Sequence, residues 1–189
     1  MLSKFLDSSE IYDGAQLVSL RNYLQHKLLG DSVIAWIGPC HVTMEHMVDG
    51  EDLVAGAQIK GDLMLHFIAE IFESSLFGAV GCQRLLAALI MDHIRETSSK
   101  TELTAKLRRD GDDVYCGDLK LSISIATQSP VSSLIHFAVN VLNQGTPVPT
   151  ISLQEFGLDP RAFAEEILRR FTGEVDSVRI ATQKVRWVR

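Results

Sequence analysis

Lysine, serine, histidine and asparagine residues fall at alternate positions in the stretch RRDGDDVYCGDLKLSISIATQSPVSSLIHFAVNV. Side chains two residues apart in a strand point to the same face, so Lys120, Ser122 and Ser124 should share one face. After a Ser-Pro break, His136 and Asn140 should share a face of a second strand. An ammonium can fix a carboxylate or phosphate, and such a pair at about 4 Å is worth roughly 4 kcal/mol at an effective dielectric near 20. If the two strands pair as a hairpin, these side chains would converge on one small-molecule cleft.

The same alternation is also typical of a half-exposed antiparallel sheet whose polar face meets only solvent. His136 lies on a mostly apolar strand, where a structural histidine is as compatible with the pattern as a functional one. Periodicity alone therefore leaves a binding cleft and a solvated sheet face as open alternatives.

Acidic and hydroxyl side chains flank the two runs. Asp112 and Asp113 could hold the lysine or the neighbouring Arg109 through charge-assisted hydrogen bonds, or form an ordinary Gly-Asp turn. Ser129 and Ser132 could donate to the polar end of a ligand, or serve as turn residues beside the proline. We include all five as candidate ligand-binding residues, each with its structural alternative.

Three further side chains are candidates for chemistry elsewhere in the chain. Cys40 follows Gly-Pro, which predicts an exposed loop thiol whose pKa a nearby lysine could lower; the alternative is a buried, inert thiol. His66 and Glu70 are four residues apart and so fall on the same side of either a helix or a strand. We add these two to the candidate ligand-binding residues.

A cluster of two imidazoles and three carboxylates could suggest a divalent metal site. Its members are His41, His46, Asp49, Glu51 and Asp52. Their spacing matches no recognised ligand pattern, so we predict no metal site here.

The order GDDVY, KLSISIA and HFAVNV resembles the central block of the biotin and lipoate protein ligase superfamily. It is especially similar to the octanoyl and lipoyl transferase branch, in which a Lys-Ile-Ala strand precedes a His-Gly strand and a closing Asn-Val. The following segment, ISLQEFGLDPRAFAEEILRRF, resembles the short Ser-Leu-x-x-x-Gly turn and closing helix of the same family. The likeness runs in order through most of the chain.

This resemblance implies roles for individual residues. It places Lys120 at the ligand-contacting lysine, His136 at the transferase histidine and Asn140 at the terminal asparagine. The implied ligand is a carboxylate-bearing small molecule, the implied reaction class is ligation or acyl transfer, and the implied second partner is an acceptor protein. Lys120 would fix the acyl carbonyl or a phosphate, and as an oxyanion donor it would contribute roughly 3 kcal/mol.

The sequence departs from the family pattern at several positions. The family carries a Gly/Arg-rich nucleotide loop where this chain has the acidic stretch GPCHVTMEHMVDGED, so ATP is a doubtful cofactor. The transferases have a nucleophilic cysteine after the Asn-Val strand, but the last cysteine here is Cys116. Asp112 replaces an asparagine, and Ser122 with Ile123 replaces small residues, which predicts a narrower pocket floor.

Composition excludes several classes of protein. The 189 residues are 46% hydrophobic and 22% charged, which fits one domain with a substantial core. The net charge of -6 argues against a nucleic-acid partner. No run approaches the roughly 20 apolar residues of a membrane span and none resembles a signal peptide, so a cytoplasmic location without a membrane partner is expected. The three cysteines form no CxxC pair and are expected to be reduced.

Periodicity and capping signals predict an α+β order of elements. The family resemblance implies that these elements form a mixed, largely antiparallel sheet flanked by helices, as in a biotin/lipoate ligase-like catalytic domain. We expect first a helix over 13–27 with a buried leucine face, and then strands over 32–38 and 41–48 separated by a Gly-Pro-Cys turn. Residues 64–72 suit either a helix or a strand, and their Phe and Ile content together with the family order favours a strand. A helix over 83–96 preceded by two glycines, the two strands discussed above, and helices over 159–171 and 174–188 should follow. Edge strands of such sheets often pair, so a homodimer is a further expectation.

Two functions remain open from the sequence. One is a ligase-like or acyltransferase-like domain in which Lys120, His136 and Cys40 carry chemistry. The other is a noncatalytic small-molecule-binding or protein-interaction module that keeps the fold without the chemistry.

Overall fold

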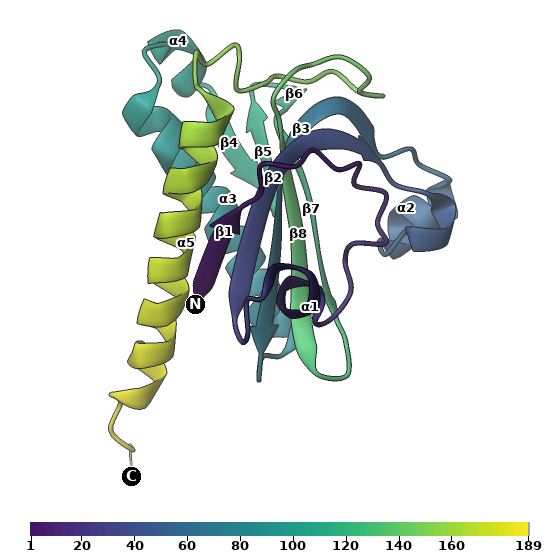
Figure 1. Ribbon diagram of the computed structural model, residues 1–189. Helices are drawn as coiled ribbons and strands as arrows, with labels where there is room; N and C mark the ends of the chain where they lie inside the picture. Colours follow the sequence, from purple (N-terminus) through teal and green to yellow (C-terminus); the bar gives the residue numbers. More distant parts are fainter. Residues whose placement is uncertain (189) are drawn as a thin grey trace.

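A five-stranded sheet in the order β1-β2-β3-β8-β7 forms the centre of the protein (Figure 1). The structure is a computed structural model and describes residues 1–188. The strands are β1 (Leu2–Phe5), β2 (Ser32–His41), β3 (Lys60–Phe72), β7 (Ser122–Gln128) and β8 (Ser132–Asn140). Only β1 and β2 pair in parallel, and the other neighbours are antiparallel. The expected mixed, largely antiparallel sheet is confirmed.

A second, three-stranded sheet precedes β7 in the chain. It consists of β4 (Leu107–Asp110), β5 (Asp113–Cys116) and β6 (Leu119–Lys120). Lys120 pairs with Tyr115 of β5, and a single residue, Leu121, separates it from β7. The lysine therefore sits where the chain passes from the small sheet to the large one.

Two long helices cover one face of the large sheet, and short helices lie on the other side (Figure 1). The long helices are α3 (Leu76–Thr97) and α5 (Pro160–Gln183). The short helices on the other side are α1 (Arg21–His26), the 3-10 turn η1 (Met44–His46) and α2 (Gly50–Ala55). The short helix α4 (Thr101–Thr104) follows α3 and lies on the side of the long helices. The main core lies between the sheet and the long helices and includes Phe67, Phe137, Ile90 and Ile167. Residues that alternate along the strands point into this core or to the opposite face.

Helix α3 is apolar enough and long enough to cross a membrane by length and composition. It packs against strands β7 and β8 and against α5. Its buried residues include Leu86, Ala87 and Ile90, which belong to the main core. The glycines expected to precede this helix, Gly78 and Gly81, lie inside it, because Ser75 caps it earlier by accepting from the Gly78 N–H at 3.1 Å.

The predicted helix over 13–27 is wrong for its first half. Leu20 has a left-handed φ of 63°, and its N–H donates to Glu70 Oε1 at 2.8 Å, so regular helix begins only at Arg21. The expected buried leucine face is also wrong, because Leu24 is 64% exposed. Tertiary hydrogen bonds decide this segment, since Asn22 also binds Ser32 Oγ at 3.1 Å.

The predicted turn at Gly-Pro-Cys and the strand over 41–48 are also wrong. β2 continues through Gly38 to His41, with its pairing to β3 shifted between Gly38 and Cys40. Gly38 is required there, because a Cβ atom would lie 2.2 Å from the Glu10 carbonyl oxygen of the segment crossing it. The residues after His41 form η1 and loops instead of a strand.

The two helices predicted near the C-terminus are one. α5 begins at Pro160, where Asp159 Oδ1 accepts from the Ala162 N–H at 2.8 Å as expected for a cap. It continues through Gly173 to Gln183 without interruption. A lone glycine weakens a helix but does not end it, so the expected boundary after Phe171 is wrong.

Candidate functional site

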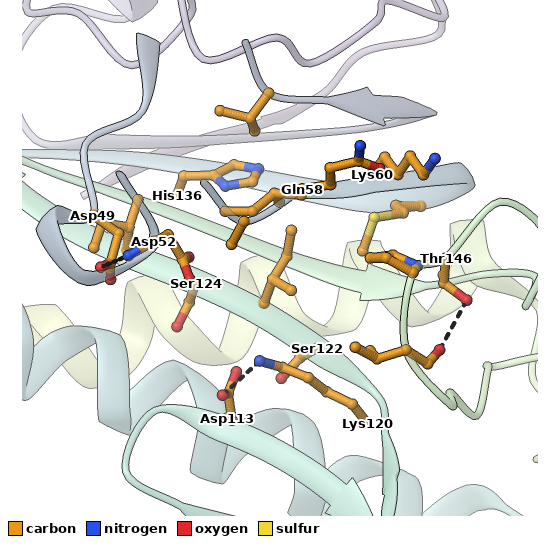
Figure 2. Close-up of a pocket in the computed structure, with 18 of the residues that line it drawn as sticks. Asp49, Asp52, Gln58, Lys60, Asp113, Lys120, Ser122, Ser124, His136 and Thr146 are labelled. Carbon is orange, nitrogen blue, oxygen red and sulfur yellow. Dashed lines mark hydrogen bonds and ion pairs between the residues drawn. The ribbon is translucent and has the colours of Figure 1, made fainter. Parts of the chain in front are cut away.

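A pocket of about 390 Å³ lies beside β7 and β8, on the side of the sheet that carries α2 (Figure 2). Strand residues form its floor, residues 42–60 form one wall, and the loop 146–150 contributes another. The apolar part of the lining comes from Met64, Ile123, Ile125, Val42, Met47 and Val48. The pocket therefore combines an apolar strand surface with polar and charged side chains, and it can take a ligand that carries both kinds of group.

Lys120 and Asp113 form an ion pair in the lining (Figure 2). Lys120 Nζ lies 2.7 Å from Asp113 Oδ2, and the two side chains are 27% and 25% exposed. Burial raises the pKa of the Asp113 carboxyl, while its hydrogen bond with Lys120 acts in the opposite direction. The expected contact between this aspartate and the lysine is confirmed, and the ammonium keeps two further donors.

Asn140 holds the backbone on which the lysine sits. Its side-chain amide donates to the Lys120 carbonyl at 3.1 Å and to the Ile151 carbonyl at 3.2 Å. Its own N–H donates to the Leu121 carbonyl at 2.9 Å. Asn140 is 3% exposed, so these contacts join the end of β8 to the β6–β7 junction and to the segment after the pocket loop.

Two buried imidazoles lie beneath the pocket in a stack of aromatic rings. His66 Nε2 lies 3.1 Å from the Gly38 carbonyl oxygen, and His66 Nδ1 lies 3.1 Å from His136 Nε2. Trp36 stacks on His66 with ring centroids 4.8 Å apart, and Tyr12 stacks on His136 at 3.6 Å. Burial lowers the pKa of His66 to about 4 and that of His136 well below 6.5. Both rings are therefore neutral at pH 7.

The two serines of β7 do not share a sheet face with His136, which corrects the expected arrangement. His136 pairs with Ile125, whereas Ser124 pairs with Phe137. Directly opposed residues in an antiparallel pair point to the same side, so Ser122 and Ser124 lie on the side of the main core. All of them still line the pocket, which takes residues from both faces of edge strand β7.

The serine hydroxyls have protein partners. Ser122 Oγ accepts from the Val114 N–H at 2.9 Å. Ser124 Oγ donates to Asp112 Oδ2 at 2.6 Å and accepts from Gln83 Nε2 at 2.8 Å. Gln83 also donates to Asp112 at 2.7 Å, so the three side chains form a closed polar cluster between α3 and β7.

Cys40 and Glu70 lie outside the pocket lining. Cys40 is 2% exposed and burial raises the pKa of its thiol to about 12, which agrees with the alternative of a buried, inert thiol. The expected loop position is wrong, because Cys40 lies in β2. Glu70 accepts from the Leu20 N–H and, at 2.7 Å, from Ser132 Oγ. Glu70 and Ser132 thus join the N-terminal segment to the sheet.

The remaining expected ligand-binding residues also lie away from the pocket lining. Ser129 Oγ accepts from the Ser132 N–H at 2.9 Å and closes the turn between β7 and β8. Arg109 is exposed and donates to the Gly111 carbonyl oxygen. His66 is fully buried behind His136 and reaches the pocket only through that ring.

The acidic segment before β3 forms a wall of the pocket. Asp49 accepts from the Glu51 and Asp52 N–H groups at 2.8 and 3.1 Å and so caps α2, while Thr43 Oγ1 lies 3.2 Å from His46 Nδ1. Within residues 1–188, no three histidine, cysteine or acidic side chains are grouped to hold a metal ion.

Several lining residues were not among the sequence candidates. They are Tyr12, Gln58, Lys60, Met64 and Thr146. Tyr12 is brought to the site by the N-terminal segment, which forms a bridge with Cys40 of β2. No local pattern marks it, because the contact joins residues 28 positions apart. Thr146 belongs to the loop that precedes the segment matched to the family pattern, and no sequence pattern marks it.

Solved structures and a curated relative resemble this chain. A protein of unknown function from Pyrococcus horikoshi is 38% identical with a TM-score of 0.92, covering 100% of this chain and 99% of that chain. Uncharacterized protein MJ0805 from Methanocaldococcus jannaschii is 29% identical over 173 residues, which are 88% of this chain and 76% of the relative. The biotin protein ligase from Aquifex aeolicus in complex with biotin and ATP is 14% identical with a TM-score of 0.58, covering 92% of this chain and 70% of that chain.

The ligase likeness concerns the fold alone, because the sequence identity is low. It agrees with the architecture expected from the GDDVY, KLSISIA and HFAVNV order. The sequence model of one family, described as "Domain of unknown function (DUF366)", matches residues 1–186. The chain belongs to the DUF366 family and has the fold of biotin protein ligases.

Proposed function

We propose that this protein binds a carboxylate-bearing small molecule of the lipoate, octanoate or biotin type, or its adenylate, in the pocket beside β7. Lys120 would contact the acyl carbonyl or the phosphate. The observation that carries the proposal is the placement of a partly exposed ammonium in the same pocket as the apolar side chains of β3 and β7. An apolar chain with one anionic end matches both features.

The charge of the lining favours a ligand with few negative charges. Two lysines face a larger number of carboxylates: Lys60 and Lys120 against Asp49, Glu51, Asp52, Asp112 and Asp113. A free polyphosphate would be repelled by these carboxylates unless cations accompanied it. The proposed ligand therefore carries a single negative charge, either a free carboxylate or the one phosphate of an acyl adenylate.

The chemistry that fits this pocket is transfer without a protein thiol. None of the three cysteines in the described chain lines the pocket. The neutral amine of an acceptor protein could attack the carbonyl of a bound acyl adenylate directly, so that an amide bond forms, the acyl–phosphate bond breaks, AMP leaves and the amine proton passes to solvent. Lys120 would then stabilise the oxyanion, a contribution of roughly 3 kcal/mol for a well-placed donor.

The alternative is a noncatalytic binding module, and one observation favours it. The ammonium of Lys120 is already engaged by Asp113 at 2.7 Å, which reduces the charge available to a developing oxyanion. Binding would survive this competition more readily than catalysis, because binding requires only that the ligand displace or share the pair. The ligase-like enzyme and the noncatalytic module therefore use the same pocket, and only the enzyme would convert the bound ligand to a product.

A panel of small molecules tests the proposal. Ligand-induced shifts in melting temperature are measured for biotin, lipoate, octanoate and the three acyl adenylates. At least one should stabilise the wild type, and Lys120→Ala should lose most of that shift. Lys4→Ala, on the exposed strand β1, is the matched control and should keep it. A panel without any stabilising member would overturn the proposal.

Turnover separates the two alternatives. A ligand found in the panel is supplied as its adenylate together with a biotin- or lipoate-acceptor domain. Covalent acylation of the acceptor by wild type and not by Lys120→Ala would support the ligase-like function. Binding without acylation would support the noncatalytic module.

A further inference from the structure

The hydrogen bonds of the two buried imidazoles determine the tautomer of His136. A carbonyl oxygen only accepts, so the His66 Nε2 that lies 3.1 Å from the Gly38 oxygen must carry its hydrogen. Because the His66 ring is neutral, its Nδ1 carries a lone pair. His136 Nε2, 3.1 Å from that lone pair, must therefore be the donor. The remaining nitrogen of His136, Nδ1, is left as an acceptor.

The ring that carries this acceptor lines the pocket. His136 lines the cavity, and no group within the described residues forms a hydrogen bond with its Nδ1. Apolar surfaces surround the ring: Tyr12 stacks on it with planes 8° apart, and its cross-strand neighbours are Ile68 on β3 and Ile125 on β7. A single lone pair is thus presented among apolar groups.

We propose that His136 Nδ1 selects ligands that present an N–H or O–H group within the apolar part of the pocket. This inference rests on the proposed function, because it assumes that the pocket binds a small molecule. It adds a required feature to that molecule: besides its anionic end, it carries a hydrogen-bond donor along its otherwise apolar body. A plain alkyl chain lacks this feature.

The selectivity comes from the cost of leaving a buried acceptor unpaired. A ligand without a donor displaces water from Nδ1 and leaves this acceptor without a hydrogen bond. A ligand with an N–H or O–H donor replaces the hydrogen bond that the water made. The expected discrimination is about tenfold in affinity, at the lower end for a single hydrogen bond. His66 acts here as a positioning residue, since it holds His136 in the acceptor tautomer without lining the pocket.

The tautomer is measured directly on the wild type. Nitrogen-15 NMR of histidine-labelled protein at pH 7 should show His136 protonated at Nε2 and unprotonated at Nδ1. His41, which is exposed, provides the reference for a tautomer mixture in the same spectrum. A proton on His136 Nδ1 would overturn the inference whatever the pocket binds.

Two neutral fragments of similar size test the selection. 2-Imidazolidinone carries two N–H donors and cyclopentanone carries none, and neither has a carboxylate for Lys120. The wild type should bind 2-imidazolidinone about tenfold more tightly, with a shift of the His136 Nδ1 resonance. Equal affinities, or no binding of 2-imidazolidinone, would overturn the inference.

Variants separate this inference from the proposed function. His136→Phe keeps a ring against Tyr12 and removes the acceptor, so the preference between the fragments should disappear. Lys120→Ala should keep the preference, because the fragments do not use the ammonium. Fragment selection without carboxylate binding would overturn only the proposed function, and carboxylate binding without fragment selection would overturn only the role of His136.

Discussion

Asp113 Oδ2 lies 2.7 Å from Lys120 Nζ, and the pair occupies the boundary between the two sheets of the protein. Asp113 begins β5 and Lys120 ends β6, so their side chains meet across adjacent strands. Each is about one quarter exposed, at 25% and 27% respectively. An anionic ligand of Lys120 must therefore compete with, or share the ammonium with, a carboxylate of the protein itself.

Removing the charge of Asp113 should strengthen binding of an anion. Asp113→Asn keeps the size of the side chain and removes its negative charge, so the affinity for the tightest-binding carboxylate of the panel should rise about fivefold, equivalent to roughly 1 kcal/mol. Isothermal titration calorimetry measures this change. Asp110→Asn, on a 78% exposed side chain, is the control and should leave the affinity unchanged. Weaker binding to Asp113→Asn would mean that the aspartate positions the lysine more than it competes for it.

Exchange of the Asn140 amide for a carboxylate should destabilise the protein. Asn140→Asp preserves shape but places an acceptor against two carbonyl oxygens that now receive N–H groups at 3.1 and 3.2 Å. The expected loss in the free energy of unfolding is about 2–4 kcal/mol in urea denaturation at pH 7. Asn143→Asp, a less buried asparagine that donates to Glu155, is the comparison and should cost less. Equal costs would contradict the account of Asn140.

Stability should decrease on mild acidification because His66 and His136 are buried in the neutral form. The lowered pKa of His66, about 4, means that between about pH 4 and 6.5 the unfolded chain binds a proton that the native chain does not. The free energy of unfolding therefore rises with pH across this window. The contribution of this ring to stability decreases as the pH falls. Between pH 7.5 and 5 the loss from this ring should be on the order of 2 kcal/mol.

Urea denaturation at these two pH values measures the acid sensitivity. His136→Phe should reduce it, because one buried imidazole is gone. His41→Ala removes an exposed ring and should leave it at the wild-type value. A wild type equally stable at both pH values would contradict burial of the imidazole pair in neutral form.

The thiol of Cys40 should be unreactive in the native protein. It is 2% exposed and burial raises its pKa to about 12, so both access and thiolate population are low at pH 7.5. Iodoacetamide labelling followed by peptide mass spectrometry should modify Cys40 only after denaturation. Cys82, which is partly exposed, serves as the internal comparison and should react earlier. Rapid labelling of native Cys40 would restore it as a candidate nucleophile.

The sequence predicted the elements that hydrophobic periodicity encodes locally. β7, β8 and the cap of α5 at Asp159 agree with the expected strands and helix start. The periodicity of residues 64–72 suits a helix as well as a strand, and the family order was needed to favour the strand that β3 forms. The first helix was wrong because Leu20 takes a left-handed conformation to reach Glu70, a partner 50 residues away. Such tertiary contacts leave no periodic signal in the segment that makes them.

The sequence indicated several residues that line the pocket, but it did not indicate which face of the sheet each side chain occupies. Lys120, His136 and Asn140 all line the pocket, but the serines of β7 face the main core side. The face of a strand depends on register, and a shift of one residue exchanges the two faces. Strand alternation in the sequence shows which residues share a face within one strand. It does not show which face of the neighbouring strand they join.

The central claim is that Lys120 anchors a carboxylate in the pocket beside β7. Calorimetric titration of the tightest-binding carboxylate of the panel into wild type and Lys120→Ala tests it most directly. We predict binding to the wild type and an affinity at least about tenfold lower for the variant, the loss of roughly 1.4 kcal/mol or more. Equal affinity of the two proteins would contradict the claim.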